Sequence, residues 1–457
     1  MTVKKPFLLL LLQIMATHQI FQALLINMQR KIAIIGTGYV GLTTGACLAY
    51  LGHKVVCVDK NEERISKLLK GEIPIYEPGI EELLEKYKEN IEYTNDIKKA
   101  ISESEVLFIA VGTPSRKDGS IDMKYFKKAV EEIAKNIDGY RVVVNKSTVP
   151  VGTGDWAKDE VKKHYKGDFA IVSNPEFLSE GSAVKDFLEP DRIVIGVKDK
   201  EAAEIMLDIY SSINAPKLVV DIKSAELIKY AANAFLATKI SFINEIANIC
   251  EKAGGDITKV AQGVGMDKRI GPHFLKAGIG YGGSCFPKDV DGLLSISSNH
   301  QHNFGLLRTV SEVNKRQQER FVEKIKSILL KIKGDTVCVW GLSFKPNTDD
   351  VRKSPAVFVV NLLCRDGIKV RAYDPIAMEN AKKELTFDNI KFCQSALEAV
   401  EGADVLALLT EWPEFNEIDL KDVKKKMKNH YILDGRNHLE ANQAKVLGFY
   451  YEGIGRK

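Results

Sequence analysis

The sequence contains no closely spaced cysteines and no strong excess of charge of either sign. Its seven cysteines are scattered between positions 47 and 393 without a CxxC pair or the spacing of metal ligands, so neither a metal site nor a disulfide framework is indicated. The 65 basic and 61 acidic residues leave a net charge of +4, too small to favour nucleic acid or a membrane surface as a partner. Cysteines outside any disulfide framework predict a reduced protein in the cytoplasm.

Long hydrophobic runs are also missing. The apolar run from Phe7 to Leu12 follows Lys4 and Lys5, as in a secretory signal, but the continuation from Gln13 to Gln22 is too polar for a membrane span. We therefore expect residues 1–27 to be an extension from an upstream start codon, outside the fold. A working signal or anchor is the alternative.

The patterns that are present indicate several domains. A chain of 457 residues is too long for one hydrophobic core. Strand and helix patterns alternate from residue 31 onward and again from residue 336, and the longest helical pattern, at 221–253, lies between them with another at 306–330. This predicts an α/β fold, with two Rossmann-like doubly wound domains joined by a central helical domain with a long spine helix. The expected boundaries are 28–215, 216–325 and 326–457.

A glycine-rich turn follows the first strand pattern, Lys31 to Ile35. Gly36 suits the tight turn, Gly38 admits a pyrophosphate to the helix N-terminus, and Gly41 allows close packing of the helix on the strand. A second strand pattern ends in Asp59, 23 positions after Gly36. This carboxylate would accept hydrogen bonds from a ribose and repel a 2′-phosphate, so NAD is predicted over NADP. A glycine turn without a ligand is the alternative.

Further loops follow the strand patterns at 105–111 and 141–145. They contain Thr113 and Thr148, and loops at the carboxyl ends of parallel strands border the ligand crevice.

The segment from Asn174 to Glu180 predicts a helix start, with Asn174 as the cap and Pro175 at the first helical position. Glu176 and Glu180 would then share a face, where their repulsion would raise a pKa. A solvated surface turn explains the segment equally well.

The long helical pattern carries Glu226, Lys229 and Asn233 on one side, among apolar residues. A desolvated lysine there is a candidate for stabilising a developing oxyanion. A lysine that extends along the surface to reach water is an equal alternative.

The segment from Gly280 to Asp289 combines Cys285 with three glycines and two charged side chains, Lys288 and Asp289. The glycines allow close approach to a bulky ligand, and a cation or a helix terminus could make the thiol nucleophilic. Taken alone, Cys285 is more readily explained as a buried structural cysteine.

The second strand and helix module echoes the first. Its second strand pattern ends in Asp374, as the corresponding one ends in Asp59, but it lacks the glycine triplet. Lys345 and Arg352 in its first loop suit a nucleotide diphosphate held by side chains.

Together these motifs resemble the nucleotide-sugar 6-dehydrogenases, the UDP-glucose/GDP-mannose dehydrogenase family, over residues 29–455. The resemblance rests, in order, on GTGYVG with Asp59, VGTP, KSTVP, NPEFLSEG, KYAAN with Lys229 and Asn233, GYGGSCFPKD, and GLSFKPNTDDVRKSP. Ser284 and the Phe-Pro-Lys after Cys285 resemble the UDP-glucose branch. The UDP-N-acetylmannosamine branch carries histidine before the cysteine, and GDP-mannose dehydrogenases follow it with leucine.

The resemblance implies an NAD-dependent four-electron oxidation of UDP-glucose to UDP-glucuronate through a thiohemiacetal and a thioester on Cys285. It implies that Lys229 and Asn233 stabilise the oxyanion, that Asp289 and Thr148 hold the hydrolytic water, and that Glu176 is the acid/base. For NAD it implies contacts from Gly36, Gly38, Tyr39, Val40, Gly41, Asp59, Arg64, Thr113, Thr148 with its neighbours Ser147 and Val149, Glu180 and Arg352. For the sugar nucleotide it implies Glu176, Phe177, Leu178, Glu180, Lys229, Asn233, Arg269, the segment Lys276 to Gly282 with Tyr281, Phe344 and Lys345.

Arg269 resembles a family arginine that reaches the substrate of a neighbouring subunit. The resemblance therefore implies a homodimer or a higher homo-oligomer whose interface lies in residues 221–330.

Three other functions fit parts of the sequence. Oxidation of UDP-N-acetylmannosamine or GDP-mannose would keep the mechanism. A one-step β-hydroxyacid dehydrogenase would leave Cys285 and residues 336–457 without a role. A non-catalytic NAD-responsive binding protein belongs to another class and predicts a damaged thiol, lysine or carboxylate site, whereas the motifs above are intact.

Overall fold

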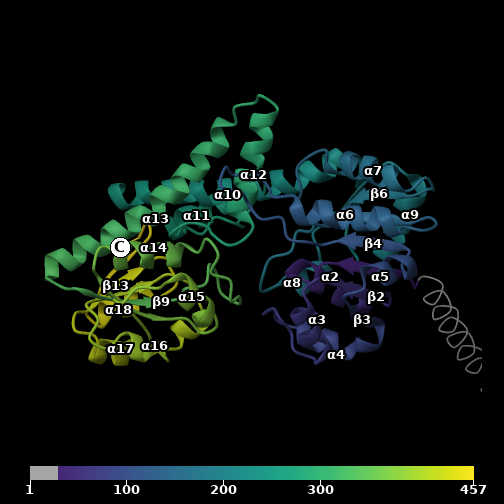
Figure 1. Cartoon of the computed structure of the whole chain (residues 1–457). Coiled ribbons are helices and arrows are strands. Elements are labelled where there is room, and N and C mark those ends of the chain that lie inside the picture. Colours follow the sequence, from purple (N-terminus) through teal and green to yellow (C-terminus); the bar gives the residue numbers. More distant parts are fainter. Residues whose placement is uncertain (1–28, 457) are drawn as a thin grey trace, which may run out of the picture. The chain divides into compact units, whose positions relative to one another are not determined.

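The computed structural model describes residues 29–456, which form two compact units (Figure 1). The first unit contains residues 29–114 and 121–229, and the second contains residues 115–120 and 230–456. The expected extension at residues 1–27 lies outside the described residues. Within residues 29–456, none of the helices is long and apolar enough to cross a membrane.

The first unit is built on an eight-stranded sheet with the order β3-β2-β1-β4-β5-β6-β7-β8. All neighbouring strands are parallel except β6 and β7. The strands are β1 (Lys31–Ile35), β2 (Lys54–Val58), β3 (Ile91–Thr94), β4 (Val106–Ile109), β5 (Val142–Asn145), β6 (Ala170–Ser173), β7 (Ile193–Val197) and β8 (Lys217–Val220). The chain reverses its direction of travel across the sheet between β1 and β4, which is where such folds bind ligands.

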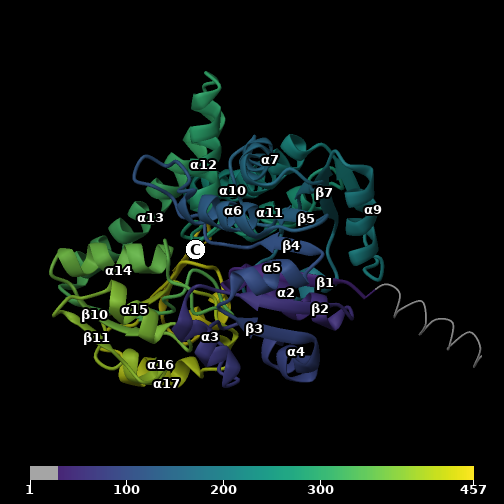
Figure 2. The same cartoon turned by 45° about the vertical axis from the view of Figure 1, so that its right-hand side comes forward.

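Helices cover both faces of this sheet (Figure 2). Alternate strand residues pack on α2 (Tyr39–Tyr50), α8 (Ala183–Leu188) and α9 (Lys200–Ile209) on one face. The other face packs on α5 (Ile97–Glu103), α6 (Lys124–Asn136) and α7 (Thr153–His164). Because both faces are buried, β4 and β5 are apolar almost throughout. Two short helices, α3 (Glu62–Leu69) and α4 (Ile80–Lys86), follow β2.

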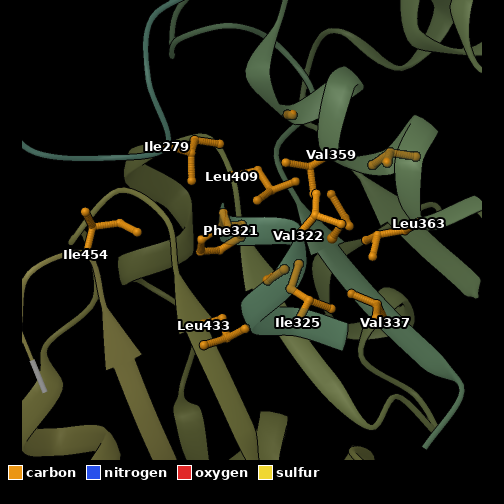
Figure 3. Packing of buried hydrophobic residues seen from close by; sticks show 14 of the residues in the cluster. Ile279, Phe321, Val322, Ile325, Val337, Val359, Leu363, Leu409, Leu433 and Ile454 are labelled. Carbon is orange, nitrogen blue, oxygen red and sulfur yellow. The ribbon is translucent and has the colours of Figure 1, made fainter. Parts of the chain in front are cut away.

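The second unit contains a parallel six-stranded sheet with the order β11-β10-β9-β12-β13-β14, which repeats the order of the first six strands of the other sheet. Its strands are β9 (Thr336–Trp340), β10 (Lys369–Tyr373), β11 (Ile390–Phe392), β12 (Val405–Leu408), β13 (Tyr431–Asp434) and β14 (Tyr450–Gly453). Figure 3 shows Phe321, Val322 and Ile325 packed among strand residues such as Val337 and Leu433. The helices around this sheet are α14 (Pro355–Arg365), α15 (Met378–Glu384), α16 (Ala396–Ala399), α17 (Leu420–Lys426) and α18 (Ala441–Val446).

A helical segment lies between the two sheets in the sequence. It consists of α10 (Ile222–Ala253), α11 (Ile257–Gly265), α12 (Phe286–Asn299) and α13 (Gly305–Ile332). The 32-residue α10 confirms the predicted spine helix, and the two Rossmann-like sheets confirm the predicted fold class. The domain boundaries at 215/216 and 325/326 stay a prediction.

The expected helix start at Asn174 is wrong. Residues 174–179 form no helix, and the next helix, α8, begins at Ala183. The side chain of Asn174 is occupied elsewhere, because its Oδ1 atom accepts hydrogen bonds from Lys146 and Tyr210 and its Nδ2 atom donates to the carbonyl of Val194. It therefore cannot cap a helix, and it fixes an extended turn instead.

Candidate active site

The glycine loop after β1 has the geometry of a dinucleotide-binding turn. Gly36 has a positive φ of 104°, and a side chain at Gly41 would collide with the carbonyl oxygen of Gly36, so both positions require glycine. A side chain at Gly38 would meet no atom within 4 Å, so the loop leaves open space at the N-terminus of α2. Space at this point fits the pyrophosphate of NAD.

Asp59 lies at the end of β2, beside this loop. Its Oδ2 atom accepts hydrogen bonds from the backbone N–H and the hydroxyl of Thr37, at 2.9 and 3.0 Å, and pairs with Arg64 at 3.0 Å. Burial opposes the charged form, but the hydrogen bonds from Asn61 and Thr37 outweigh it and lower the pKa of Asp59. The carboxylate is therefore held ionised and oriented, as the predicted contact with a ribose requires.

The loops after β4 and β5 are tied together. The Thr113 hydroxyl donates to the carbonyl of Thr148 at 2.9 Å, and the Ser147 hydroxyl donates to the carbonyl of Val111 at 2.8 Å. These residues stand at the carboxyl ends of neighbouring strands, so the sheet brings together two segments that lie about 35 residues apart in sequence.

A buried ion pair joins α10 to the turn after β6. Lys229 Nζ lies 2.9 Å from Glu176 Oε1, and the two side chains are 4% and 7% exposed. The side chain of Lys229 therefore does not extend to the solvent, and Glu176 does not lie on a solvent-exposed turn. Both alternative interpretations of the sequence are excluded. The ammonium of Lys229 also lies 5.6 Å from the centre of the Phe177 ring.

The expectation of a raised pKa at this turn is wrong for Glu176. Burial alone would raise it, but Lys229 and the backbone N–H of Leu178, which donates at 2.6 Å, reverse the effect and lower the pKa of Glu176. Glu180 lies four residues farther along a non-helical turn and is half-buried. Glu176 is therefore arranged as a carboxylate.

Glu77, which the sequence reasoning missed, links the cofactor loop to this turn. Its Oε2 atom accepts hydrogen bonds from the hydroxyl of Tyr39 and, at 2.6 Å, from the backbone N–H of Gly181. Its Oε1 atom accepts from the backbone N–H of Ala183 at 2.7 Å. One buried carboxylate thus connects a residue of the glycine motif to the residue that follows Glu180.

In the second unit, Cys285 occupies the N-cap position of α12 and is partly exposed. The positive end of a helix dipole stabilises negative charge, so this position favours the thiolate that a nucleophile requires. The Ser284 hydroxyl lies 3.6 Å from the sulfur. The other six cysteines are buried, and all seven are thiols.

Asp289 follows Cys285 by one turn of α12 and is fully buried. Its Oδ2 atom accepts a hydrogen bond from Asn233 at 2.5 Å, and its Oδ1 atom pairs with Lys288 at 2.5 Å. Asn233 lies on α10 one turn after Lys229. The structure therefore brings Asn233 and Asp289 together near the start of α12.

One carboxamide side chain, that of Asn314, holds the glycine-rich segment before Cys285. Asn314, on α13, accepts a hydrogen bond from the backbone N–H of Tyr281 and donates to its carbonyl, at 2.8 and 3.0 Å. A side chain at Gly280 would meet Asn314 Oδ1 at 2.6 Å, and one at Gly283, where φ is 83°, would meet the Phe344 ring at 2.7 Å. Sequence reasoning missed Asn314, whose place in a regular helical pattern gives no signal.

The remaining residues of the second unit that were predicted to contact the cofactor or the substrate lie near Phe344 or on exposed loops. The ammonium of Lys345 lies 5.5 Å from the centre of the Phe344 ring. A side chain at Gly282 would collide with the carbonyl oxygen of Lys353. Arg352 pairs with Asp350 through its Nε and Nη2 atoms. Lys276 and Arg269 are exposed, and Arg269 pairs with Asp267 at 2.6 Å.

Metal ligands do not cluster in the part of the chain that the structure describes. No group of three or more histidine, cysteine, aspartate or glutamate side chains in residues 29–456 could hold a metal ion.

Comparison with known proteins identifies the family. Residues 30–214 match the NAD-binding domain of the UDP-glucose/GDP-mannose dehydrogenase family, residues 223–316 match its central domain, and residues 338–441 match its UDP-binding domain. The chain belongs to this family. The predictions of an NAD-dependent dehydrogenase and of NAD as cofactor are confirmed.

Individual relatives are similar over nearly the whole chain. The UDP-glucose 6-dehydrogenase TuaD of Bacillus subtilis is 48% identical over 431 residues, which cover 93% of each chain. The UDP-glucose 6-dehydrogenase of Rhizobium meliloti is 46% identical over 436 residues, 93% of this chain and 99% of that protein. The solved UDP-glucose dehydrogenase of Pyrobaculum islandicum is 36% identical with a TM-score of 0.87, covering 94% of this chain and 98% of that one. The solved UDP-D-ManNAc dehydrogenase of Pyrococcus horikoshii is 29% identical with a TM-score of 0.82, covering 93% and 99%.

The cofactor geometry yields a test of Asp59. In the variant Asp59→Asn, we expect the KM for NAD to rise about tenfold or more, because a hydrogen bond to a charged group contributes about 1.5–3 kcal/mol. The preference for NAD over NADP should narrow, since the charge that repels a 2′-phosphate is gone. Initial rates with both cofactors measure this. Asp199→Asn, a matched change at the N-cap of α9, should alter neither the KM for NAD nor the preference for NAD over NADP. An unchanged cofactor preference in Asp59→Asn would contradict the assignment.

Proposed function

We propose that this protein oxidises UDP-glucose to UDP-glucuronate, consuming two NAD⁺ and one water and releasing two NADH and three protons. The observation that carries the proposal is the thiol of Cys285 at the start of α12, one turn before a buried Asp289 that Asn233 holds. A one-step alcohol dehydrogenase has no need of such a thiol. Curated relatives named UDP-glucose 6-dehydrogenase are 42–48% identical, which favours UDP-glucose over UDP-N-acetylmannosamine, whose solved dehydrogenases are 26–29% identical.

The chemistry follows from the need to remove two hydrides from one carbon. Bound NAD⁺ would accept one hydride from C6 in each oxidation. The first oxidation also releases the proton of the C6 hydroxyl. The thiolate of Cys285 then attacks the aldehyde carbon, and the carbonyl oxygen becomes the oxyanion of a thiohemiacetal. Loss of the second hydride gives a thioester, and water then cleaves the carbon–sulfur bond to restore the thiolate. Covalent capture keeps the aldehyde in place and makes the second oxidation intramolecular.

The polar residues divide the remaining tasks. Lys229 and Asn233 donate to the oxygen that becomes negative, Asp289 and Thr148 hold the hydrolytic water, and Glu176 moves the proton in thioester formation and hydrolysis. Cofactor contacts are proposed for Gly36, Gly38, Tyr39, Val40, Gly41, Asp59, Arg64, Thr113, Thr148, Glu180 and Arg352. Substrate contacts are proposed for Glu176, Phe177, Leu178, Glu180, Lys229, Asn233, Arg269, Lys276, Tyr281, Gly282, Phe344 and Lys345.

Counting NADH per sugar tests the reaction. With UDP-glucose as the limiting substrate, we expect two NADH per molecule consumed, and a fall in turnover of roughly 10³-fold or more in Cys285→Ala. Cys364→Ala, a matched change at a buried cysteine of α14, should keep the stoichiometry. The same count is made with UDP-N-acetylmannosamine and with GDP-mannose, each as the only sugar substrate.

Each other outcome identifies an alternative. One NADH per sugar, or turnover indifferent to Cys285, would refute the thioester route. Preference for another sugar would change the substrate and keep the mechanism. Binding of NAD without turnover of any sugar would favour a non-catalytic protein.

We also propose that the protein is a homodimer in which Arg269 serves the partner's site. Phe235, Phe242 and Ile249 on α10 are 66%, 54% and 58% exposed at intervals of seven residues, so they form one apolar stripe. The loop that carries Arg269 is tied to the same helix, because Lys239 donates to the carbonyl of Ile270 at 3.0 Å. The Arg269 side chain is 89% exposed, which leaves it available to a second copy.

Phe242→Glu should convert the dimer to a monomer, because it places a charge in the centre of the apolar stripe. Sedimentation velocity measures the mass. Val446→Glu, at an exposed valine of α18, is the control and should leave the mass unchanged. A dimer that persists in Phe242→Glu would contradict an interface on this stripe.

Mixing the inactive variants Arg269→Ala and Cys285→Ala tests the shared site. If subunits exchange freely, activity should return to about one quarter of that of the wild type, because half the dimers then hold one intact site. No recovery despite proven exchange would contradict the role of Arg269 across the interface.

A further inference from the structure

Lys146 is a buried lysine for which the reaction above gives no role. It follows the last residue of β5, and the residue is 5% exposed. Its Nζ atom donates to Asn174 Oδ1 at 3.0 Å. The rings of Phe187 and Tyr210 lie 5.8 and 5.9 Å from the ammonium, on the side of α8 and the end of α9. A lysine is rarely buried without a charged partner.

The titratable neighbours of Lys146 come from three elements. Glu176 on the turn after β6 favours the ammonium, Lys229 on α10 opposes it, and the buried thiol of Cys47 on α2 also lies within electrostatic range. Burial is the largest influence and lowers the pKa of Lys146 to about 8, so the side chain is charged at neutral pH. Burial raises the pKa of Cys47 to about 12, so this thiol is neutral there, and burial likewise raises the pKa of Tyr210.

One carboxylate therefore lies among two buried ammonium groups. Glu176 pairs directly with Lys229, and the charge of Lys146 also lowers the pKa of Glu176. A buried ion pair needs only one cation for neutrality, and a second one costs desolvation energy. The second cation, Lys146, has a function if Lys229 moves away from Glu176 to contact the substrate during the reaction.

We propose that Lys146 is a positioning residue, the second cation of Glu176, which keeps this carboxylate charged while Lys229 donates to the substrate oxygen. The inference rests on the proposed function, in which Lys229 stabilises the oxyanion and Glu176 moves a proton. Without Lys146, a shift of Lys229 toward the substrate would leave Glu176 buried with no cation, and the carboxylate would take up a proton. Asn174, held by both Lys146 and Tyr210, fixes the turn that presents Glu176.

The pH profile of kcat/KM separates this role from a structural one. In the wild type, we expect activity to fall at acid pH as Glu176 becomes protonated. Loss of the cation in Lys146→Met should move this acid limb to higher pH, by roughly one unit, because the charge of Lys146 lowers the pKa of Glu176. Where the limb governs the rate, that displacement corresponds to a fall of about tenfold relative to the plateau.

Two matched variants serve as controls. Tyr210→Phe removes the other hydrogen bond to Asn174 Oδ1, at 2.6 Å, without changing the charge, so the acid limb should stay in place. Lys146→Arg keeps a cation at this position, so its acid limb should lie at the same pH as that of the wild type. An unmoved limb in Lys146→Met, or an equal displacement in Tyr210→Phe, would overturn the inference.

A measurement without turnover covers the case in which the proposed reaction fails. Urea unfolding of wild type, Lys146→Met, Glu176→Gln and the double variant forms a double-mutant cycle. At pH 7 the effect of Lys146→Met on the free energy of unfolding should differ measurably between the wild-type background and the Glu176→Gln background, because only the former carries the carboxylate charge. Strictly additive effects would contradict the pairing whether or not UDP-glucose is the substrate. If Lys146→Met does not fold, Lys146→Gln replaces it in both experiments.

Discussion

The buried ion pair between Lys229 and Glu176 is the interaction on which the first half of the candidate site depends. Its two atoms lie 2.9 Å apart with almost no exposure to water. Breaking such a pair from one side leaves an uncompensated buried charge and costs about 3–5 kcal/mol. This cost fixes the start of α10 against the turn after β6. It also explains why Glu176 is ionised in a setting where burial alone would favour its neutral form.

The same helix distributes polar anchors along one side. In the first unit, Glu226 accepts hydrogen bonds from the backbone N–H groups of Gly152 and Gly154 at the start of α7, and Lys229 holds Glu176. In the second unit, Asn233 holds Asp289. These residues recur at helical spacing, so each of them anchors a segment that is distant from it in sequence.

Much of this arrangement could be predicted from local pattern. The glycine triplet with Asp59, the Rossmann-like character of both sheets, α10, and the grouping of Cys285 with Asp289 all follow from short motifs whose spacing carries their geometry. Residues whose partners are distant in sequence could not be found in this way. Glu77 bonds to Gly181, 104 positions away, and Lys146 bonds to Asn174, 28 positions away. The wrong prediction of a helix start at Asn174 has the same origin. A local rule assigns this side chain to a helix cap, but it forms hydrogen bonds with residues distant in sequence instead.

The central claim is that Cys285 becomes covalently attached to the substrate carbon. Acid quenching of the Asp289→Asn variant during turnover with UDP-glucose and NAD⁺, followed by mass spectrometry of the peptide that contains Cys285, tests it most directly. Because the variant lacks the carboxylate proposed to hold the hydrolytic water, the thioester should accumulate, and the peptide should gain the mass of one UDP-glucuronyl group. An unmodified Cys285 in a sample that continues to release NADH would contradict the account.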